Sequence, residues 1–89
     1  MNYNAPMDIG VEISLYPLAE RFAPEIHDFI ARIGAVPDLK VVSSSLSTQV
    51  FGDYERVFDA LRRELRATLE SRERQGGKAA LVLKVLGPL

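Results

Sequence analysis

The spacing of the apolar residues changes repeatedly along the chain, and these changes constrain the fold more than any other feature. Residues 9–16 alternate between apolar and polar or small side chains, which is the period of a half-buried strand. The apolar residues that follow recur every three or four positions, which is the period of a helix with one buried stripe. Two strand-like segments, a second helical stripe and a final apolar strand come next. The predicted order is therefore strand–helix–strand–strand–helix–strand.

Turn and capping residues set the expected boundaries of these elements. The expected strands cover residues 9–16, 39–45, 47–51 and 79–86, and the expected helices cover residues 22–33 and 53–74. Pro17 ends the first strand because proline cannot donate a ladder hydrogen bond. Gly34 is a typical residue for the end of the first helix. Asp53 is expected to cap the second helix, because its carboxylate can accept hydrogen bonds from the first free amides.

This order of elements predicts the fold class. Two strand–helix–strand units in 89 residues indicate a single α+β domain over residues 1–89, with its core at about 9–86. Because crossover connections are right-handed, few topologies remain. We expect a ferredoxin-like βαββαβ sandwich, with a four-stranded antiparallel sheet of order 4-1-3-2 and both helices on one face.

The composition argues against several classes of function. The net charge of −1 lacks the concentrated positive field of a nucleic-acid-binding protein. The absence of cysteine excludes disulfides and thiolate sites, and a single histidine, His27, argues against a metal site. Residues 1–6 do not resemble a secretion signal, and no apolar run approaches the roughly 20 residues of a membrane span. We expect a cytoplasmic protein without a metal, nucleic-acid or membrane partner.

Polar side chains should gather at one end of the predicted sheet, where the first strand ends and the next two strands meet. The hydroxyl-bearing residues at this end are Ser14, Tyr16, Ser43, Ser45, Ser47 and Thr48. Ser43, Ser45 and Thr48 are in phase with Val41 and Val50, and so should point between the sheet and the helices. A buried hydroxyl without a partner costs about 1–3 kcal/mol. Two interpretations stay open: the hydroxyls bond the backbone of their own hairpin, or they line a pocket for a polar ligand closed by Tyr16 and Phe22.

The face of the sheet away from the helices is expected to be too apolar for a fully hydrated surface. Val42, Phe51, Val82 and Leu86 fall on it by their phase. Because large exposed apolar patches mark interfaces, we expect a homodimer or homotetramer that forms through this open face. Glu12 lies on the same face, either in a salt bridge to Lys84 or Lys40 or in contact with a ligand or partner.

Two short segments resemble the YkoF-type thiamine/hydroxymethylpyrimidine-binding domains. Residues 14–18 (SLYPL), followed by Phe22 and a helix, are similar to the start of such a domain. Residues 46–53 (LSTQVFGD), followed by Val57, Phe58 and a long helix, are similar to its second signature. With the last strand, the resemblance covers residues 9–86. The family's namesake proteins carry two such domains in tandem, whereas this chain has one and would have to pair with itself.

The resemblance implies a ferredoxin-like fold, no catalysis, no cofactor, and binding of thiamine or its pyrimidine half. It supports Ser14, Tyr16, Ser47 and Thr48 as ligand-site positions. An aminopyrimidine offers ring nitrogens and an amino group to hydroxyl, amide and carboxylate partners, and its flat ring can stack on an aromatic side chain. The partners available for these contacts are Ser14, Thr48, Gln49 and Glu12, with Tyr16 or Phe22 for stacking.

Two other functions remain to be weighed against a non-catalytic small-molecule-binding protein. One is a homo-oligomeric protein-interaction or regulatory module without a thiamine-type ligand. The other is an enzyme on the same fold, since a fold does not fix a function. Against an enzyme, no glycine-rich loop with a placed arginine and asparagine is visible, and the two asparagines are Asn2 and Asn4.

Overall fold

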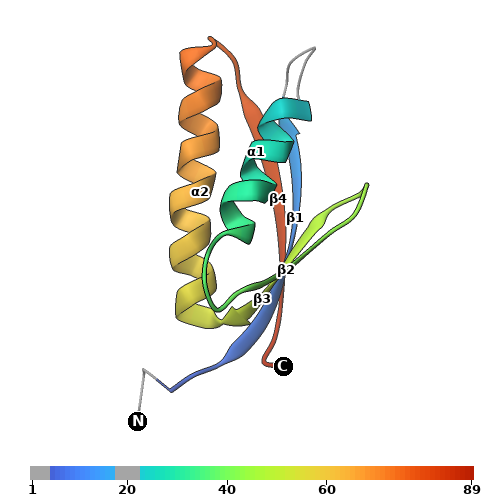
Figure 1. Ribbon diagram of the computed structural model, residues 1–89, viewed down its shortest axis with the longest axis vertical. Coiled ribbons are helices and arrows are strands. Elements are labelled where there is room, and N and C mark those ends of the chain that lie inside the picture. The colour runs from blue at the N-terminus through green and yellow to red at the C-terminus, as the bar shows by residue number, and fades with distance from the viewer. Residues whose placement is uncertain (1–4, 18–22) are drawn as a thin grey trace.

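The computed structural model describes residues 5–17 and 23–89. A four-stranded sheet lies against two helices, as Figure 1 shows. The elements are β1 (Asp8–Pro17), α1 (Ala23–Gly34), β2 (Lys40–Ser43), β3 (Thr48–Asp53), α2 (Tyr54–Arg74) and β4 (Ala79–Leu86). The predicted order of elements is confirmed, and α1 ends at Gly34 as expected. Residue 22, where the first helix was predicted to begin, lies outside the described residues.

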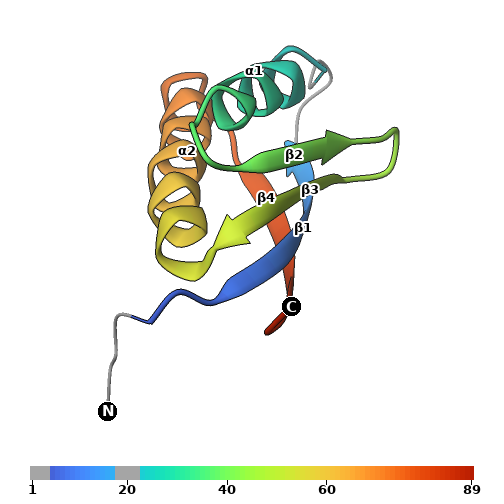
Figure 2. The ribbon, with the colours of Figure 1, turned by 60° about the horizontal axis from the view of Figure 1, so that its bottom comes forward.

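The sheet has the order β2-β3-β1-β4, which is the predicted order 4-1-3-2 read from the other edge. All neighbouring strands are antiparallel. Both helices cover the same face of this sheet, as the two views in Figures 1 and 2 show. The chain therefore has the predicted ferredoxin-like α+β fold. Within its described part, neither helix has the length and apolarity needed to cross a membrane.

The core lies between the sheet and the helices. Alternate residues of the two central strands point into it, and one stripe of each helix meets them. Its buried members are Ile9, Val11, Ile13, Phe29, Ile33, Val50, Val57, Ala60 and Leu61. Burying a large apolar side chain contributes about 1.5–3 kcal/mol. This layer therefore fixes the positions of the strands and helices around it.

Asp53 is the N-cap residue of α2 as predicted, but the expected hydrogen bond from its side chain is replaced by a tertiary contact. Asp53 directly precedes α2, but in the described structure its carboxylate accepts no hydrogen bond from the helix. Its Oδ1 atom instead accepts a hydrogen bond of 3.1 Å from the Met7 amide. The Tyr54 amide, at the start of α2, donates to the Met7 carbonyl at 2.7 Å. The segment before β1 thus supplies the partners at this end of the helix.

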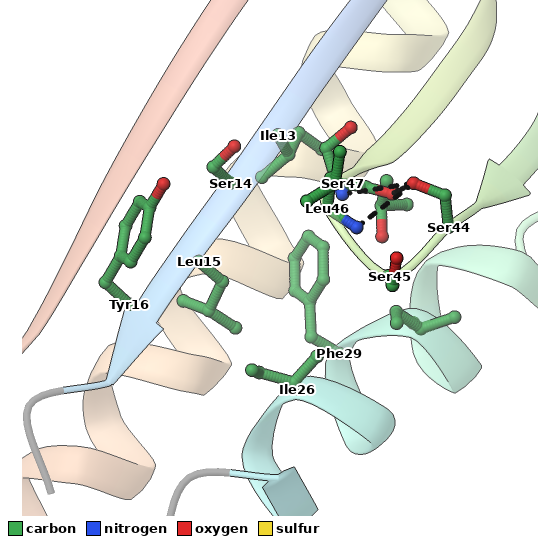
Figure 3. Close-up of a pocket in the computed structure, with 12 residues that line it drawn as sticks. Ile13, Ser14, Leu15, Tyr16, Ile26, Phe29, Ser44, Ser45, Leu46 and Ser47 are labelled. Atoms are coloured by element: carbon green, nitrogen blue, oxygen red, sulfur yellow. Dashed lines mark hydrogen bonds between the residues drawn. The ribbon is translucent and has the colours of Figure 1, made fainter.

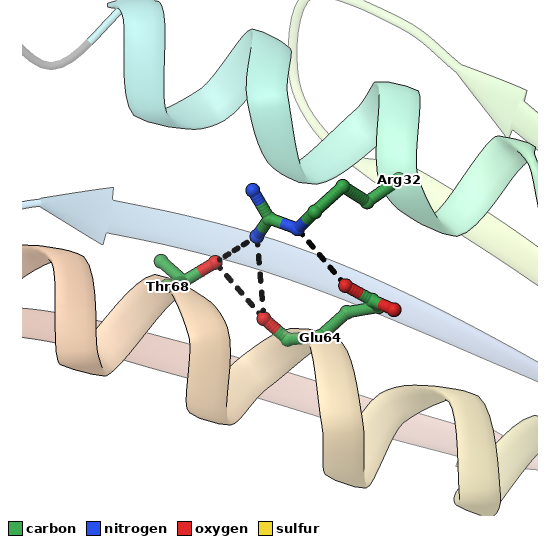
Figure 4. A network of polar contacts seen from close by, with 3 residues as sticks. All are labelled: Arg32, Glu64 and Thr68. Atoms are coloured by element: carbon green, nitrogen blue, oxygen red, sulfur yellow. Dashed lines mark hydrogen bonds and ion pairs between the residues drawn. The ribbon is translucent and has the colours of Figure 1, made fainter.

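A polar link holds the two helices together (Figure 4). Arg32 of α1 donates from Nε to Glu64 Oε1 of α2 at 2.9 Å and from Nη2 to Thr68 Oγ1 at 2.8 Å. The Thr68 hydroxyl in turn donates to the Glu64 carbonyl at 3.1 Å. Because the ion pair is partly buried, it fixes the spacing of the helices more than an exposed pair would.

A second ion pair is buried where the end of α2 meets the start of α1. Arg72 is 4% exposed and donates from Nη1 to Glu25 Oε1 at 3.1 Å. The missing side chain of Gly77 leaves room for the guanidinium. Burial alone would raise the pKa of the Glu25 carboxyl, but hydrogen bonds from Arg72, from the Glu25 backbone amide and from Gln75 lower this pKa below its ordinary value.

Candidate ligand-binding site

A cavity of about 320 Å³ opens where the end of β1, the β2–β3 turn and α1 meet (Figure 3). This is the end of the sheet at which the hydroxyls were predicted to gather. The lining residues are Ile13, Ser14, Leu15, Tyr16, Ile26, Phe29, Ile30, Ser44, Ser45, Leu46, Ser47 and Thr48. Small-molecule sites are commonly apolar hollows of at least about 300 Å³ with a few polar groups. The cavity has this size and this mixture.

The cavity exists because β1 extends beyond β3. The pairing of β1 with β3 ends at Ile13 and Thr48, whereas its pairing with β4 continues to Pro17 and Ala79. Residues 14–16 therefore have one edge that pairs with no other strand of the described chain. Successive residues of an extended strand turn their N–H and C=O groups to opposite edges. At least one backbone donor–acceptor pair of residues 14–16 must therefore face this open edge, beside the cavity.

The hydroxyls of the turn do not share one role. Ser44 bonds its own hairpin, because its Oγ accepts from the amides of Leu46 at 3.2 Å and Ser47 at 3.3 Å. Ser43 Oγ and Thr48 Oγ1 bond each other at 2.7 Å. The first interpretation, in which the hydroxyls bond their own hairpin's backbone, therefore holds for Ser44.

Three of the hydroxyls that line the cavity make no hydrogen bond within the described chain. These are the hydroxyls of Ser14 and Tyr16 on β1 and of Ser45 in the turn. The Ser47 hydroxyl is used differently, since it donates to Glu12 Oε2 at 3.2 Å. The first three hydroxyls reach the rim of the cavity from different sides, because Ser14 and Tyr16 lie on the open face of β1 and Ser45 lies in the turn. The Ser47 hydroxyl connects this rim to a carboxylate.

The predicted site residues at this end of the sheet come from both of its faces: Thr48 lies on the helix side with Ile13, whereas Ser14 and Tyr16 lie on the open face with Glu12. The residues that line the cavity are Ser14, Tyr16, Ser45, Ser47 and Thr48. Ser43 is not among the lining residues and reaches the cavity only through its bond to Thr48. Phe22 lies outside the described residues.

Glu12 and Gln49 lie elsewhere, on the open face of the sheet. They are cross-strand neighbours on β1 and β3, and with Val11, Phe51 and Leu86 they line a second hollow of about 280 Å³. Glu12 also forms an ion pair of 3.5 Å with Lys84, which was one of the open alternatives for this residue. Neither residue touches the first cavity directly.

The apolar floor of the cavity was not among the predicted site residues. It consists of Ile26, Phe29 and Ile30 from α1, together with Leu15 and Leu46. The sequence did contain a signal for it, since the apolar stripe of α1 faces the strand end that carries hydroxyls. An apolar helix stripe that faces polar residues has no apolar side chains to pack against, so a cavity can form at that position.

Comparisons with known proteins bear on the fold. No protein-family model matches this chain, and no curated protein matches it. A hypothetical protein, MJ1052 of Methanocaldococcus jannascii, has a TM-score of 0.76 and 19% sequence identity over 91% of this chain and 80% of its own. TM0486 of Thermotoga maritima, provisionally named a thiamine biosynthesis/salvage protein, has a TM-score of 0.76 and 21% identity, with 88% and 81% covered.

A third similar structure is a domain of unknown function, DUF77, from Bacillus cereus. Its TM-score is 0.68 and its identity is 14%, over 93% of this chain and 79% of that one. These likenesses show the fold. The identities are too low to transfer a ligand, and the thiamine-related name is that of the Thermotoga protein, not of this chain.

Proposed function

We propose that this protein binds thiamine or its hydroxymethylpyrimidine half, without catalysis, in the cavity at the end of the sheet, and that it does so in the cytoplasm. The observation that carries the proposal is a hollow with an apolar floor, with rim hydroxyls that make no hydrogen bond to the described residues, and with a strand edge that pairs with no described strand. These are the complementary features for a small, flat, polar ring.

The unpaired edge of β1 is the feature that favours an aminopyrimidine. Such a ring carries an amino donor beside a ring-nitrogen acceptor. One strand residue presents an N–H donor beside a C=O acceptor on the same edge. The ring could therefore pair with a residue of 14–16 as a neighbouring strand would, through two hydrogen bonds. Each is worth about 0.5–1.5 kcal/mol net in a site that excludes water.

Side chains of the cavity would complete the contacts. Ser45 and the buried Thr48 hydroxyl can bond the hydroxymethyl group or the second ring nitrogen, and Ser14 can reach a ligand from the open-face side of the rim. Phe29 offers an apolar wall, whereas the exposed Tyr16 ring projects from β1 away from Phe29 and can contact a ligand only at the rim.

The chemistry of the lining favours binding over catalysis. The described residues that line the cavity include no carboxylate, imidazole, thiol or amine. General acid–base or nucleophilic catalysis usually relies on such groups. The resemblance of residues 14–18 and 46–53 to thiamine-binding domains, and the provisional name of the Thermotoga protein with the same fold, support the ligand class.

Calorimetric titration tests this proposal. The ligand-free protein is titrated separately with hydroxymethylpyrimidine, with thiamine and with the thiazole half of thiamine. We expect the first two to bind and the thiazole half, which lacks the aminopyrimidine edge, to bind much more weakly. If neither pyrimidine compound binds at about 1 mM, which corresponds to roughly 4 kcal/mol of binding free energy, the ligand assignment is wrong. The interaction-module interpretation would then be preferred.

A further inference from the structure

The outer strand β4 is apolar and exposed on both of its faces. Val82 and Leu86 are 51% and 68% exposed on the open face, and Leu83 and Val85 are 40% and 54% exposed on the helix side. The helix-side exposure arises because α1 packs on β1 and β2, whereas α2 packs on β1 and β3. In the described structure, β4 is therefore the strand that the helices leave least covered.

The two outer strands of the sheet differ in how they are protected. β2 has four residues and begins with an exposed lysine, Lys40. Short and charged outer strands of this kind resist pairing with other chains. β4 has eight residues with one charge, Lys84, and contains no proline. A long apolar outer strand presents unpaired N–H and C=O groups and usually meets a partner.

We propose that β4 pairs in an antiparallel manner with β4 of a second copy of this chain, so that two sheets join into one of eight strands. A two-fold axis perpendicular to the sheet leaves the two faces of the sheet unchanged, so each residue of β4 pairs with a residue of the same face. Residues on one face are an even number of positions apart, so the axis passes through the residue midway between them. We place it at Leu83, so that Leu83 of each copy lies opposite its equivalent.

Charge and side-chain size select this register. An axis at Lys84 would set two ammonium groups directly opposite each other, which is unfavourable. An axis at Val82 would set the exposed Leu86 opposite a lysine, Lys78. An axis at Leu83 avoids both contacts. It sets Lys84 opposite the partner's Val82, Val85 opposite the partner's Leu81, and Leu86 opposite the small Ala80 of the partner.

A second copy is the occupant that this strand fits best. In the chosen register the exposed Leu83, Val85 and Leu86 each face an apolar residue of the partner's β4, and Val82 faces the aliphatic chain of Lys84. Lys84 already pairs with Glu12 of its own chain at 3.5 Å, so its charge is partly balanced in the dimer. A specific interface buries at least about 1,000 Å² in total, so side chains on both faces of the two strands must take part.

A matched pair of lysine substitutions tests the proposal. Leu83 on β4 and Val42 on β2 are 40% and 43% exposed, so a lysine at either position can reach water in the monomer. Circular dichroism spectra of both variants are recorded first, to check that each variant folds. We expect light scattering to give a dimer of about 20 kDa for the unmodified chain of 9.9 kDa and for Val42→Lys. Leu83→Lys should weaken dimerisation at least roughly tenfold, because it sets two lysines opposite each other.

Two results would overturn the proposal. A monomeric unmodified protein at about 0.1 mM would show that β4 does not associate at concentrations where moderate interfaces form. Dissociation by Val42→Lys, with Leu83→Lys still dimeric, would show instead that the copies meet through the open face.

Cross-linking gives an independent measurement that does not depend on destabilising the dimer. The chain contains no cysteine, so Leu83→Cys introduces a single thiol at the proposed axis. Directly opposite residues of antiparallel strands bring their Cβ atoms within about 5.5 Å, which is close to disulfide geometry. Mild oxidation should give a covalent dimer of Leu83→Cys and leave Val42→Cys monomeric. The reverse pattern would contradict pairing through β4.

Discussion

Replacing Thr48 with valine separates a role in ligand binding from a role in stability. Thr48 is 6% exposed and lines the cavity, and its hydroxyl bonds the Ser43 hydroxyl at 2.7 Å. Valine has nearly the same shape and a high preference for strands, so Thr48→Val removes the hydroxyl and little else. Any change in affinity can then be assigned to that group.

The structure gives the expected size of both effects. In the free protein Thr48→Val removes one hydrogen bond between neutral groups, and the exposed Ser43 can bond water instead. We expect a loss of about 0.5 kcal/mol in the free energy of unfolding, or roughly 2–4 °C in melting temperature for a domain of this size. If the Thr48 hydroxyl also bonds the ligand, affinity for hydroxymethylpyrimidine should fall by about 1–2 kcal/mol, which is roughly 5- to 30-fold.

Ser43→Ala is the matched control, because it breaks the same hydroxyl pair from the side that does not line the cavity. It should lower the melting temperature by a similar amount and leave the affinity within about twofold, since Thr48 keeps its hydroxyl. Thermal melting and calorimetry on the three proteins measure both quantities. The reasoning is refuted if Thr48→Val binds as tightly as the unmodified protein, or if Ser43→Ala loses as much affinity.

Four further substitutions test the contacts that hold the elements around the site in place. Gly77→Ala should destabilise the protein by about 1–3 kcal/mol in urea unfolding, because its Cβ would overlap the Arg72 guanidinium. Gly34→Ala, at a position with free space, should be neutral or stabilising, and equal losses at both glycines would contradict the packing. Arg32→Met, which removes the link between the helices, should cost about 1–2 kcal/mol in the same assay; an unchanged unfolding midpoint would mean that the link contributes nothing. The pKa of Glu25 is lowered in the folded state, so its ion pair stabilises the protein above the unfolded-state pKa of about 4.3, and this stabilisation is lost as the pH falls through the folded-state pKa. Glu25→Gln should therefore flatten the dependence of the free energy of unfolding on pH below about 4.5. An unchanged slope would contradict this.

The fold was predictable because each local pattern of apolar residues is compatible with one type of secondary structure. The alternation in residues 9–16 and the stripe of α1 specify a strand and a helix that bury one side each. The order of the elements and the hand of the crossovers then leave few sheet orders, of which 4-1-3-2 is the one observed. The same topology brings the end of β1 and the β2–β3 turn together, so the location of the cavity followed from the fold.

The contacts that the sequence could not predict join residues far apart in the chain. Arg72 and Glu25 are separated by 47 positions, and no local pattern indicates that they would be buried together. Asp53 has the residue type and position of a helix cap, but the Met7 amide competes for its carboxylate. Glu12 was expected on the open face from the phase of its strand, and its cross-strand neighbour Gln49 lies there too. The sequence did not show on which face of the sheet a cavity would form.

The most direct test of the central claim is to locate the bound ligand. Backbone amide spectra of the ¹⁵N-labelled protein are recorded as hydroxymethylpyrimidine is added. The account predicts that the largest shifts occur in residues 14–16 and 44–48, which line the cavity at the end of the sheet. Shifts centred instead on Gln49, Phe51 and Leu86, which line the hollow on the open face, would contradict it, as would saturating ligand that shifts no amide at all.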